Sequence, residues 1–282
     1  MPVIGRLRIT TLAEDTAGEP GLMAEHGLCL LIEADGHQIL FDAGQGKVLL
    51  ANARRLGADL RQVEAVVLSH GHYDHTGGLA QVLPRASRPV VHLHPAALEK
   101  KYARADQPPH RSIGIPDLAA REIHAQARGV VRTRKPTEVL PGIYVTGEIP
   151  RHTDFESASG PFFLDEQCRR PDPVIDDQAL YVDSIEGLVV VLGCAHAGVV
   201  NTLEYISHLT GRGQIRAVLG GMHLLRAPAD WVDQTLRALE RLDVQTVAPC
   251  HCTGLAAVAR FQSALGSRVV DCRTGSRLQF GG

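Results

Sequence analysis

The chain has 282 residues, of which 44% are hydrophobic and 21% are charged, so disordered and fibrous classes are excluded. Its 29 Lys and Arg residues nearly balance 31 Asp and Glu residues, and the net charge of −2 gives no broad basic field of the kind that nucleic-acid-binding proteins use. Because six cysteines lack a disulfide-like spacing and no signal peptide or membrane-spanning apolar run is visible, we expect a cytoplasmic protein with neither a membrane nor a nucleic-acid partner.

The first forty residues predict strands that are joined by turns. Residues 7–12 suit a half-buried strand, and a polar loop with Gly and Pro follows at 14–21, where substrate contacts are common. Residues 28–34 and 38–41 predict a hairpin, because Asp35-Gly36 between them suits a tight turn.

Asp42 follows the second strand of this hairpin, in the sequence FDAG. A carboxylate at the end of a buried strand needs partners, because an unpaired buried charge is costly. The alternative is an Asp that only caps a turn. Residues 47–56 then have apolar side chains at helical spacing and stop at Gly57, which predicts a helix with a glycine C-cap.

The densest group of candidate metal ligands follows a short apolar run. Residues 66–68 predict a buried strand that stops at Ser69, where small residues permit a tight loop. Beyond it lie His70, His72, Asp74 and His75. Imidazole and carboxylate groups bind zinc and similar cations, and alternating positions on a loop can aim His70 and His72 at one point. Asp74 and His75 would then point to a second, neighbouring point.

A second imidazole pair, His92 and His94, lies at the end of a strand predicted at 89–93, after a short helix near 79–83. The surrounding residues supply no third ligand, so this pair falls short of a zinc site. We therefore interpret His92 and His94 as structural or rim residues.

Residues 100–140 are interrupted by prolines and charges, which indicates an insertion over the site or a solvent-facing segment. Residues 149–174 combine aromatic and cationic side chains, and this mixture suits either a pocket for a small organic anion or a surface loop. Basic clusters in both segments are expected on solvated faces, with anion binding as the alternative. They consist of Lys100, Lys101 and Arg104, and of Arg169 and Arg170.

The second half of the chain alternates strands and helices. Strands are predicted at 188–192, 215–219 and 244–248, with helices at 200–209 and 230–242 between them. Each of these three strands is followed by a histidine, namely His196, His223 and His251. Sites in α/β sheets gather at the carboxyl ends of strands, so these three histidines are candidate site residues.

The motifs resemble those of one family. SHGHYDHTGG at 69–78 matches the HxHxDH signature of the metallo-β-lactamase superfamily of dinuclear metal hydrolases. Further motifs are similar to the branch of the archaeal ribofuranosylaminobenzene 5'-phosphate synthase; they are FDAGQ, DDQAL, GCAHAGVVN, GGMHL and PCHCTG. The resemblance implies an α/β fold, a four-layer αββα sandwich, in a single domain over 1–282 with a loop-rich insertion around 100–175.

The resemblance also implies ligands for two metal ions. One ion would be held by His70, His72 and His196, and the other by Asp74, His75 and His251. Asp42 would steady the metal loop from behind. The family's bridging Asp is missing here, and three residues are alternatives for its place: Cys194, His223 and Asp177. We favour His223, as a ligand or as a nearby acid/base group.

The resemblance predicts a metal-dependent hydrolase that uses metal-activated water on a small ester, lactone or phosphoester. Asp74 and His223 are the candidate catalytic residues, and zinc is the expected metal, with iron and manganese as alternatives. A phosphoribosyl-type transferase and a catalytically silent metal-binding module are the competing functions. The expected partner is a small anionic substrate, and the oligomeric state stays open, a homo-oligomer included.

Overall fold

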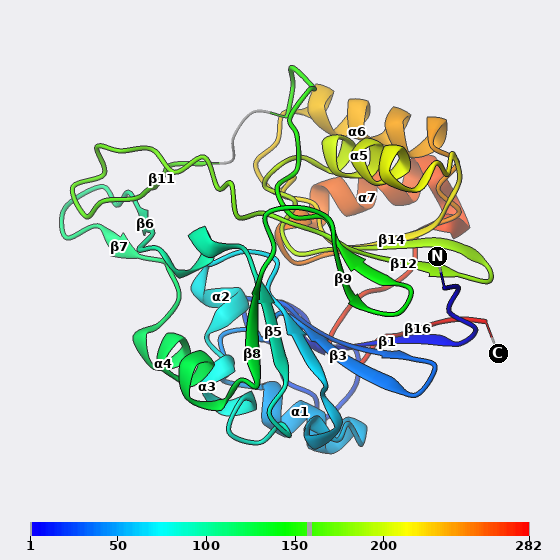
Figure 1. Ribbon diagram of the computed structural model, residues 1–282. Helices are drawn as coiled ribbons and strands as arrows, with labels where there is room; N and C mark the ends of the chain where they lie inside the picture. Colours follow the sequence, from blue (N-terminus) through cyan, green and yellow to red (C-terminus); the bar gives the residue numbers. More distant parts are fainter. Residues whose placement is uncertain (1, 157–159, 282) are drawn as a thin grey trace.

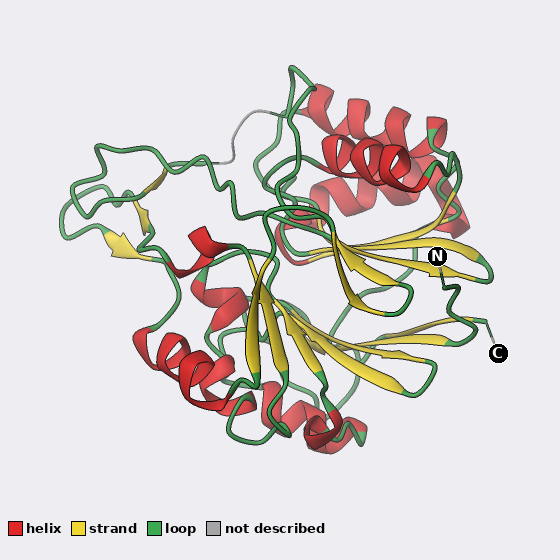
Figure 2. Ribbon diagram, viewed as in Figure 1, coloured by secondary structure: helices red, strands yellow, loops and turns green. Residues whose placement is uncertain are grey.

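The computed structural model describes residues 2–156 and 160–281, which form four layers. Two β-sheets lie face to face, and helices cover the outer face of each sheet (Figure 1, Figure 2). A small third sheet projects to the left in Figure 1. The predicted four-layer αββα sandwich is confirmed.

The seven-stranded sheet has the order β16-β1-β2-β3-β4-β5-β8. Its first four strands pair antiparallel, whereas β3, β4, β5 and β8 run parallel. The bounds are β1 Leu7–Ala13, β2 Cys29–Ala34, β3 His37–Phe41, β4 Ala65–Val67, β5 Val90–Leu93, β8 Gly129–Arg132 and β16 Arg277–Phe280.

The six-stranded sheet has the order β15-β14-β13-β12-β10-β9, and β13, β14 and β15 are its parallel strands. Its bounds are β9 Thr137–Leu140, β10 Ile143–Val145, β12 Leu180–Ser184, β13 Gly187–Leu192, β14 Ile215–Gly221 and β15 Thr246–Cys250. The small sheet has the order β11-β6-β7, with β6 Tyr102–Ala103, β7 Arg111–Ser112 and β11 Phe162–Phe163.

Helices form the two outer layers (Figure 2). The seven-stranded sheet is covered by α1 Leu49–Leu56, α3 Leu79–Val82 and α4 Asp117–Gln126, and the six-stranded sheet by α5 Val199–Thr210, α6 Ala229–Arg241 and α7 Leu255–Leu265. The remaining short helices are α2 Tyr73–Thr76, η1 Leu60–Gln62, η2 Pro95–Leu98, η3 His251–Thr253 and η4 Gly266–Arg268. Within the described ranges, none of these helices is long and apolar enough to cross a membrane.

Apolar side chains fill the three spaces between the layers. Along β13, Val189 and Val191 belong to the core between the sheets, whereas Val190 and Leu192 pack against the helices. This alternation follows from the two-residue period of a strand. Because both faces of β13 are buried, its sequence is a continuous apolar run, which is why it was recognisable as a strand.

Turn and cap chemistry agrees with the sequence analysis. Asp35 and Gly36 join β2 to β3 with φ angles of 48° and 92°, which a tight hairpin turn requires. Gly57 ends α1 in the left-handed region, with φ of 72°. The hairpin and the glycine-capped helix are therefore confirmed.

The segment 100–175 contains regular elements as well as loops. Ala119 and Ile123 of α4 are part of the core under the seven-stranded sheet, β8 extends that sheet, and β9 and β10 extend the other one. The rest of the segment consists of loops and the small sheet. Residues 157–159 lie outside the described residues.

Lys101 corrects the sequence analysis, which expected it on a solvated face. Its side chain is fully buried, and Nζ lies 2.8 Å from Asp172 Oδ2 and 2.9 Å from Asp176 Oδ1. Although burial alone would lower the pKa of Lys101, these two carboxylates raise it above the ordinary value. Asp176 Oδ2 also accepts a hydrogen bond from the backbone of Gly71, at 2.8 Å. Lys101 thus connects the small sheet to the loop that carries His70 and His72.

Replacing Lys101 by Met should destabilise the protein by about 3–5 kcal/mol, because two buried carboxylates lose their counter-charge. The exposed neighbour Lys100 offers a matched control, and Lys100→Met should stay within about 0.5 kcal/mol of the wild type. Urea unfolding measures both variants. Equal stabilities of the two would contradict a structural role for the buried ion pair.

Candidate metal centre

The candidate ligands follow the carboxyl ends of strands from both large sheets. His70, His72, Asp74 and His75 follow β4, His196 follows β13, His223 follows β14 and His251 follows β15. Two imidazole contacts of 3.2 Å join the sheets, one between His70 and His196 and one between His75 and His251. The candidate centre therefore lies at the common edge of the two sheets, as is usual for α/β proteins.

Three imidazoles converge in the first group. His70 Nε2 lies 2.9 Å from His72 Nδ1 and 3.2 Å from His196 Nε2. Two nitrogen ligands that are each about 2.0–2.1 Å from a tetrahedral zinc ion lie about 3.3 Å from one another. The spacings from His70 to the other two imidazoles therefore suit ligands of a single bound ion, and the ring centroids of His72 and His196 lie 5.0 Å apart.

A carboxylate and two imidazoles converge in the second group. Asp74 Oδ2 lies 3.6 Å from His251 Nε2 and 3.8 Å from His75 Nε2, and the two imidazole nitrogens are 3.2 Å apart. The structure thus brings together both sets of three ligands that the resemblance implied. We call them the first triad and the second triad.

Cys194 lies between the two triads. Its Sγ is 3.2 Å from His75 Nε2. Its Sγ is also within 4.8 Å of ligand atoms of His70 and His196, and of ligand atoms of His75 and His251. Among the described residues, neither Asp177 nor His223 joins a triad in this way. Of the three alternatives for the bridging place, the geometry favours Cys194.

The second ring nitrogen of three of these histidines has a polar partner. His70 Nδ1 lies 2.9 Å from Ser69 Oγ, and His75 Nδ1 lies 2.6 Å from Asp42 Oδ2. His251 Nδ1 lies 2.7 Å from Asp15 Oδ1. Since an ionised carboxylate can only accept, Nδ1 of His75 and of His251 carries a hydrogen, and Nε2 is the ring nitrogen that would face a metal ion. Metal-binding histidines are commonly oriented in this way.

Asp42 organises the metal loop from behind. Its Oδ1 accepts a hydrogen bond of 2.7 Å from the Ser69 backbone, and its Oδ2 accepts one of 2.6 Å from Ser69 Oγ. Ser69 also lies tight against Gly193, where an added Cβ would come 2.1 Å from Ser69 Oγ. Glycine is therefore required where the end of β13 approaches the loop. The structure thus shows Asp42 in contact with the loop that it was predicted to steady.

The DDQ sequence at 176–178 supports the backbone around the centre. Asp177 Oδ2 accepts a hydrogen bond of 2.7 Å from the backbone of Ala197, next to His196. Gln178 Nε2 donates one of 2.7 Å to the carbonyl of Leu68. Together with the contact from Asp176 to Gly71, these bonds fix both loops that carry the first triad. Asp177 thus holds a ligand loop in place.

The protonation states suit cation binding. Burial, together with neighbouring imidazoles, holds the pKa of His70 and of His196 well below the ordinary value, and burial lowers the pKa of His72 to about 3. Burial alone would raise the pKa of Asp74, but the hydrogen bond from His26 and nearby histidines hold it well below its ordinary range. His75 differs: burial alone would lower its pKa, but Asp42 and Asp74 raise it to about 9, so a metal ion would have to displace a proton there. Neutral imidazoles and an ionised carboxylate are the forms that bind a metal ion. The residues present therefore fit a divalent cation.

Phe162 of β11 covers the first triad. Its ring centroid lies 4.9 Å from that of His72, 5.6 Å from that of His196 and 6.4 Å from that of His223. The other phenylalanines of the segment 149–174 face elsewhere, since Phe155 packs against Trp231 and Phe163 lies under Arg104. The aromatic contribution of this segment to the centre therefore comes from Phe162.

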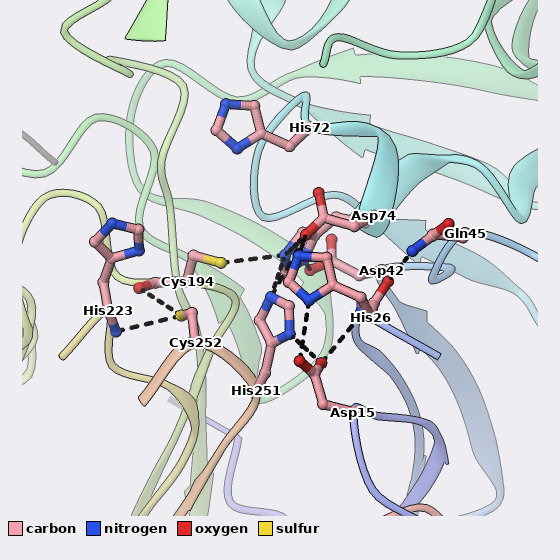
Figure 3. A network of polar contacts seen from close by, with 12 residues as sticks. Asp15, His26, Asp42, Gln45, His72, Asp74, Cys194, His223, His251 and Cys252 are labelled. Atoms are coloured by element: carbon pink, nitrogen blue, oxygen red, sulfur yellow. Dashed lines mark hydrogen bonds and ion pairs between the residues drawn. The ribbon is translucent and has the colours of Figure 1, made fainter. Parts of the chain in front are cut away.

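His223 stands beside the first triad. Its ring centroid lies 4.5 Å from that of His196, and its backbone nitrogen donates a hydrogen bond of 3.3 Å to Cys252 Sγ. In Figure 3, Cys252 and His223 form a group on the Cys194 side, apart from Asp74.

Sequence reasoning missed two residues at the mouth of the centre, Asp15 and His26. His26 Nδ1 lies 2.9 Å from Asp15 Oδ2, and its Nε2 lies 3.2 Å from Asp74 Oδ2 (Figure 3). The His26 side chain is 54% exposed. Proximity to Asp15 and Asp74 raises the pKa of His26 to about 10. The polar loop at 14–21, where substrate contacts are expected, was a signal for Asp15, whereas no sequence pattern pointed to His26.

Known proteins are similar to this chain over most of its length. The model of the metallo-beta-lactamase superfamily matches residues 23–251. A Methanocaldococcus jannaschii protein, 7,8-dihydropterin-6-methyl-4-(beta-D-ribofuranosyl)-aminobenzene-5'-phosphate synthase, is 31% identical over 92% of this chain and 91% of its own length. The crystal structure of Tm1679, a metal-dependent hydrolase of the beta-lactamase superfamily, has a TM-score of 0.84 and 34% identity over 98% of this chain and 100% of that one. YhfI from Bacillus subtilis shares the fold alone, with a TM-score of 0.60 and 11% identity over 96% of this chain and 99% of that one.

Replacing Asp42 by Asn should weaken metal binding by about 10–100-fold, because the group that orients His75 loses its charge. Asn tolerates the left-handed backbone that Asp42 adopts, with φ of 57°, so the loop itself should be preserved. Competition with a chromophoric chelator measures the affinity. Asp59→Asn, at a partly exposed position, is the control. An Asp42→Asn protein that binds metal as tightly as this control would refute the supporting role.

Proposed function

The chain belongs to the metallo-beta-lactamase superfamily, and from this premise we propose that it is a metal-dependent hydrolase of a small ester, lactone or phosphoester. The observation that carries the proposal is that one thiol, that of Cys194, lies within 4.8 Å of ligand atoms from two histidines of each triad. These are His70 and His196 of the first triad and His75 and His251 of the second. A module that kept the fold without the chemistry would have no need for both triads. The likeness to Tm1679 over 98% of the chain supports the same class of activity.

Each triad has an assigned role. His70, His72 and His196 would hold one divalent ion, and Asp74, His75 and His251 would hold the other. Cys194 would contact both ions. A bound ion of this kind polarises a carbonyl or phosphoryl oxygen and lowers the pKa of water from about 15.7 toward 7. Asp74 serves as a ligand, and its contact with His26 keeps its carboxylate ionised and oriented.

Zinc suits this donor set best. Imidazole, thiolate and carboxylate are its usual protein ligands, and the spacing within the first triad fits tetrahedral coordination. Iron and manganese are the alternatives, although a thiolate is a poorer partner for manganese, which prefers oxygen ligands.

A transferase is the second candidate. The likeness to the Methanocaldococcus jannaschii synthase extends over 92% of this chain and supports a reaction on a phosphorylated ribose derivative. A cationic centre binds the anionic substrate of either reaction by Coulombic attraction. The two candidates differ in whether water or a second organic molecule accepts the transferred group.

A substrate panel separates these functions. Purified protein is stripped with a chelator, reloaded with zinc, iron or manganese, and assayed with esters, lactones, phosphoesters and a phosphoribosyl donor with an arylamine acceptor. We expect metal-dependent hydrolysis of at least one member. Acceptor-dependent turnover would establish the transferase, and no turnover of any member by metal-loaded protein would establish a binding module.

Cys194 can be tested as the shared ligand. Cys194→Ala should lower the metal content or weaken the binding of at least one ion about tenfold or more, because both triads lose a ligand. Cys194→Asp should recover most of the binding, since it restores the carboxylate that relatives of this fold use. Metal content after dialysis and activity are the measurements. A Cys194→Ala protein with full metal content and full activity would exclude a bridging thiolate.

A further inference from the structure

We propose that Cys194, His223 and Cys252 form a third cation site, which takes a soft or borderline divalent ion such as zinc or cadmium. The three side chains come from loops that follow β13, β14 and β15. Their ligand atoms all lie within 4.8 Å of one another. Figure 3 shows them together, on the side of the centre away from Asp15. The proposal goes beyond the two triads, which account for neither His223 nor Cys252.

The spacing is close to that of a bound ion. A tetrahedral zinc ion holds two sulfur ligands, each about 2.3 Å away, at about 3.8 Å from one another. Atoms that lie within 4.8 Å of one another therefore need to approach by at most about 1 Å. Rotation about the side-chain bonds of His223 and Cys252 supplies a movement of this size without a change in the strands.

His223 supplies a second, independent observation. Its Nδ1 atom is buried, yet it has no hydrogen-bond partner among the described residues. A buried polar atom without a partner costs about 1–3 kcal/mol. A cation coordinated by this ring nitrogen would remove that cost. The contact with His196 packs the ring beside the first triad but leaves Nδ1 unsatisfied.

The surroundings of Cys252 suit a thiolate ligand. Cys252 Sγ accepts a hydrogen bond of 3.3 Å from the backbone of His223. As a thiol it donates one of 3.6 Å to the carbonyl oxygen of Cys194, and this bond would be given up when a metal ion replaces the proton. A backbone N–H that points at sulfur stabilises the negative charge that a metal ligand carries. Gly221 leaves the room that the sulfur needs, since an added Cβ would lie 2.7 Å from Cys252 Sγ.

The donor set determines the class of ion. Two thiolates and one imidazole favour zinc, cadmium and other soft cations over magnesium or calcium, which prefer oxygen. Three protein ligands leave a fourth position open to water or substrate, as in catalytic zinc sites. Because Cys194 also belongs to the geometry of both triads, an ion in the third site would share a ligand with the neighbouring centre. His223 is thereby assigned to cation binding rather than to proton transfer.

Cadmium titration of the reduced full-length protein tests the proposal. We expect wild-type protein to bind one more Cd²⁺ per chain than Cys252→Ser. We also expect the wild-type protein to show a strongly deshielded ¹¹³Cd resonance, typical of sulfur-rich coordination, that is missing from the spectrum of Cys252→Ser. Cys272→Ser is the matched control and should retain both the ion and the resonance. The test compares the number of bound Cd²⁺ ions in Cys252→Ser with the number in Cys272→Ser. This difference can be measured whether or not the two triads bind ions, so the result is independent of the proposed function.

A second variant guards against a simple loss of structure. His223 has φ of 51°, and Asn tolerates this backbone, so His223→Asn removes the imidazole with little strain. It should weaken the same Cd²⁺ about 10–100-fold while thermal unfolding of the metal-free protein stays near that of the control. If Cys252→Ser and His223→Asn both bind as many ions as Cys272→Ser, with the same affinities and resonances, the third site does not exist.

Discussion

The buried carboxylate of Asp42 is the interaction on which the rest of the centre depends. It is wholly inaccessible to solvent, and it receives hydrogen bonds from the backbone and side chain of Ser69 and from His75. A buried charge is tolerated only when it is fully paired, so each of these bonds is required. Through them, one side chain at the end of β3 fixes the start of the metal loop and the ring that the second triad needs. The position of Asp42 therefore decides the geometry of ligands that lie thirty residues further along the chain.

Backbone strain is concentrated around the same edge of the sheets. Asp42, Ala195, His223 and His251 all adopt left-handed φ angles between 50° and 57°, which residues other than glycine rarely adopt. Each costs about 1–3 kcal/mol and persists only where the surrounding structure enforces it. All four directly follow, or lie within three residues of, a strand that is buried on both faces. The rigid sheets thus sustain turns that aim the side chains inward, which a flexible loop could not do.

The candidate metal ligands could be predicted from the sequence, whereas the residues that contact and support them could not. The HxHxDH motif and the histidines after three apolar strands could be recognised because strand periodicity and ligand type are local properties. The burial of Lys101 could not be predicted, because a lysine beside another lysine is expected at the solvated surface. Its carboxylate partners, Asp172 and Asp176, lie about seventy residues further along the chain. The same holds for Asp15 and His26, whose contacts with His251 and Asp74 depend on how the two sheets pack. Strand β12 and helix α7 were also missed, since no strand or helix was predicted over Leu180–Ser184 or Leu255–Leu265.

The choice of Cys194 over His223 for the shared position shows the same limit. Both residues follow a glycine-rich strand end, and in sequence either could replace a carboxylate. The parallel register of β13 and β14 distinguishes them. The last pair of this ladder is Leu192 with Gly220, so His223 lies three residues beyond the last pair. Cys194 lies only two residues beyond Leu192, and its shorter side chain reaches His75, whereas the ring of His223 packs on His196.

A thiolate at the shared position has a consequence for substrate binding. Two divalent ions would bring four positive charges, and the only anionic groups that contact them directly would be Asp74 and Cys194. Asp42 and Asp15 lie one shell further out and act through imidazole rings. The centre would therefore keep a net positive charge among buried side chains, where Coulombic interactions are stronger than in water. A thiolate carries the same single negative charge as the carboxylate that it replaces, so it does not reduce the net positive charge of the centre. The centre would therefore attract an anionic substrate.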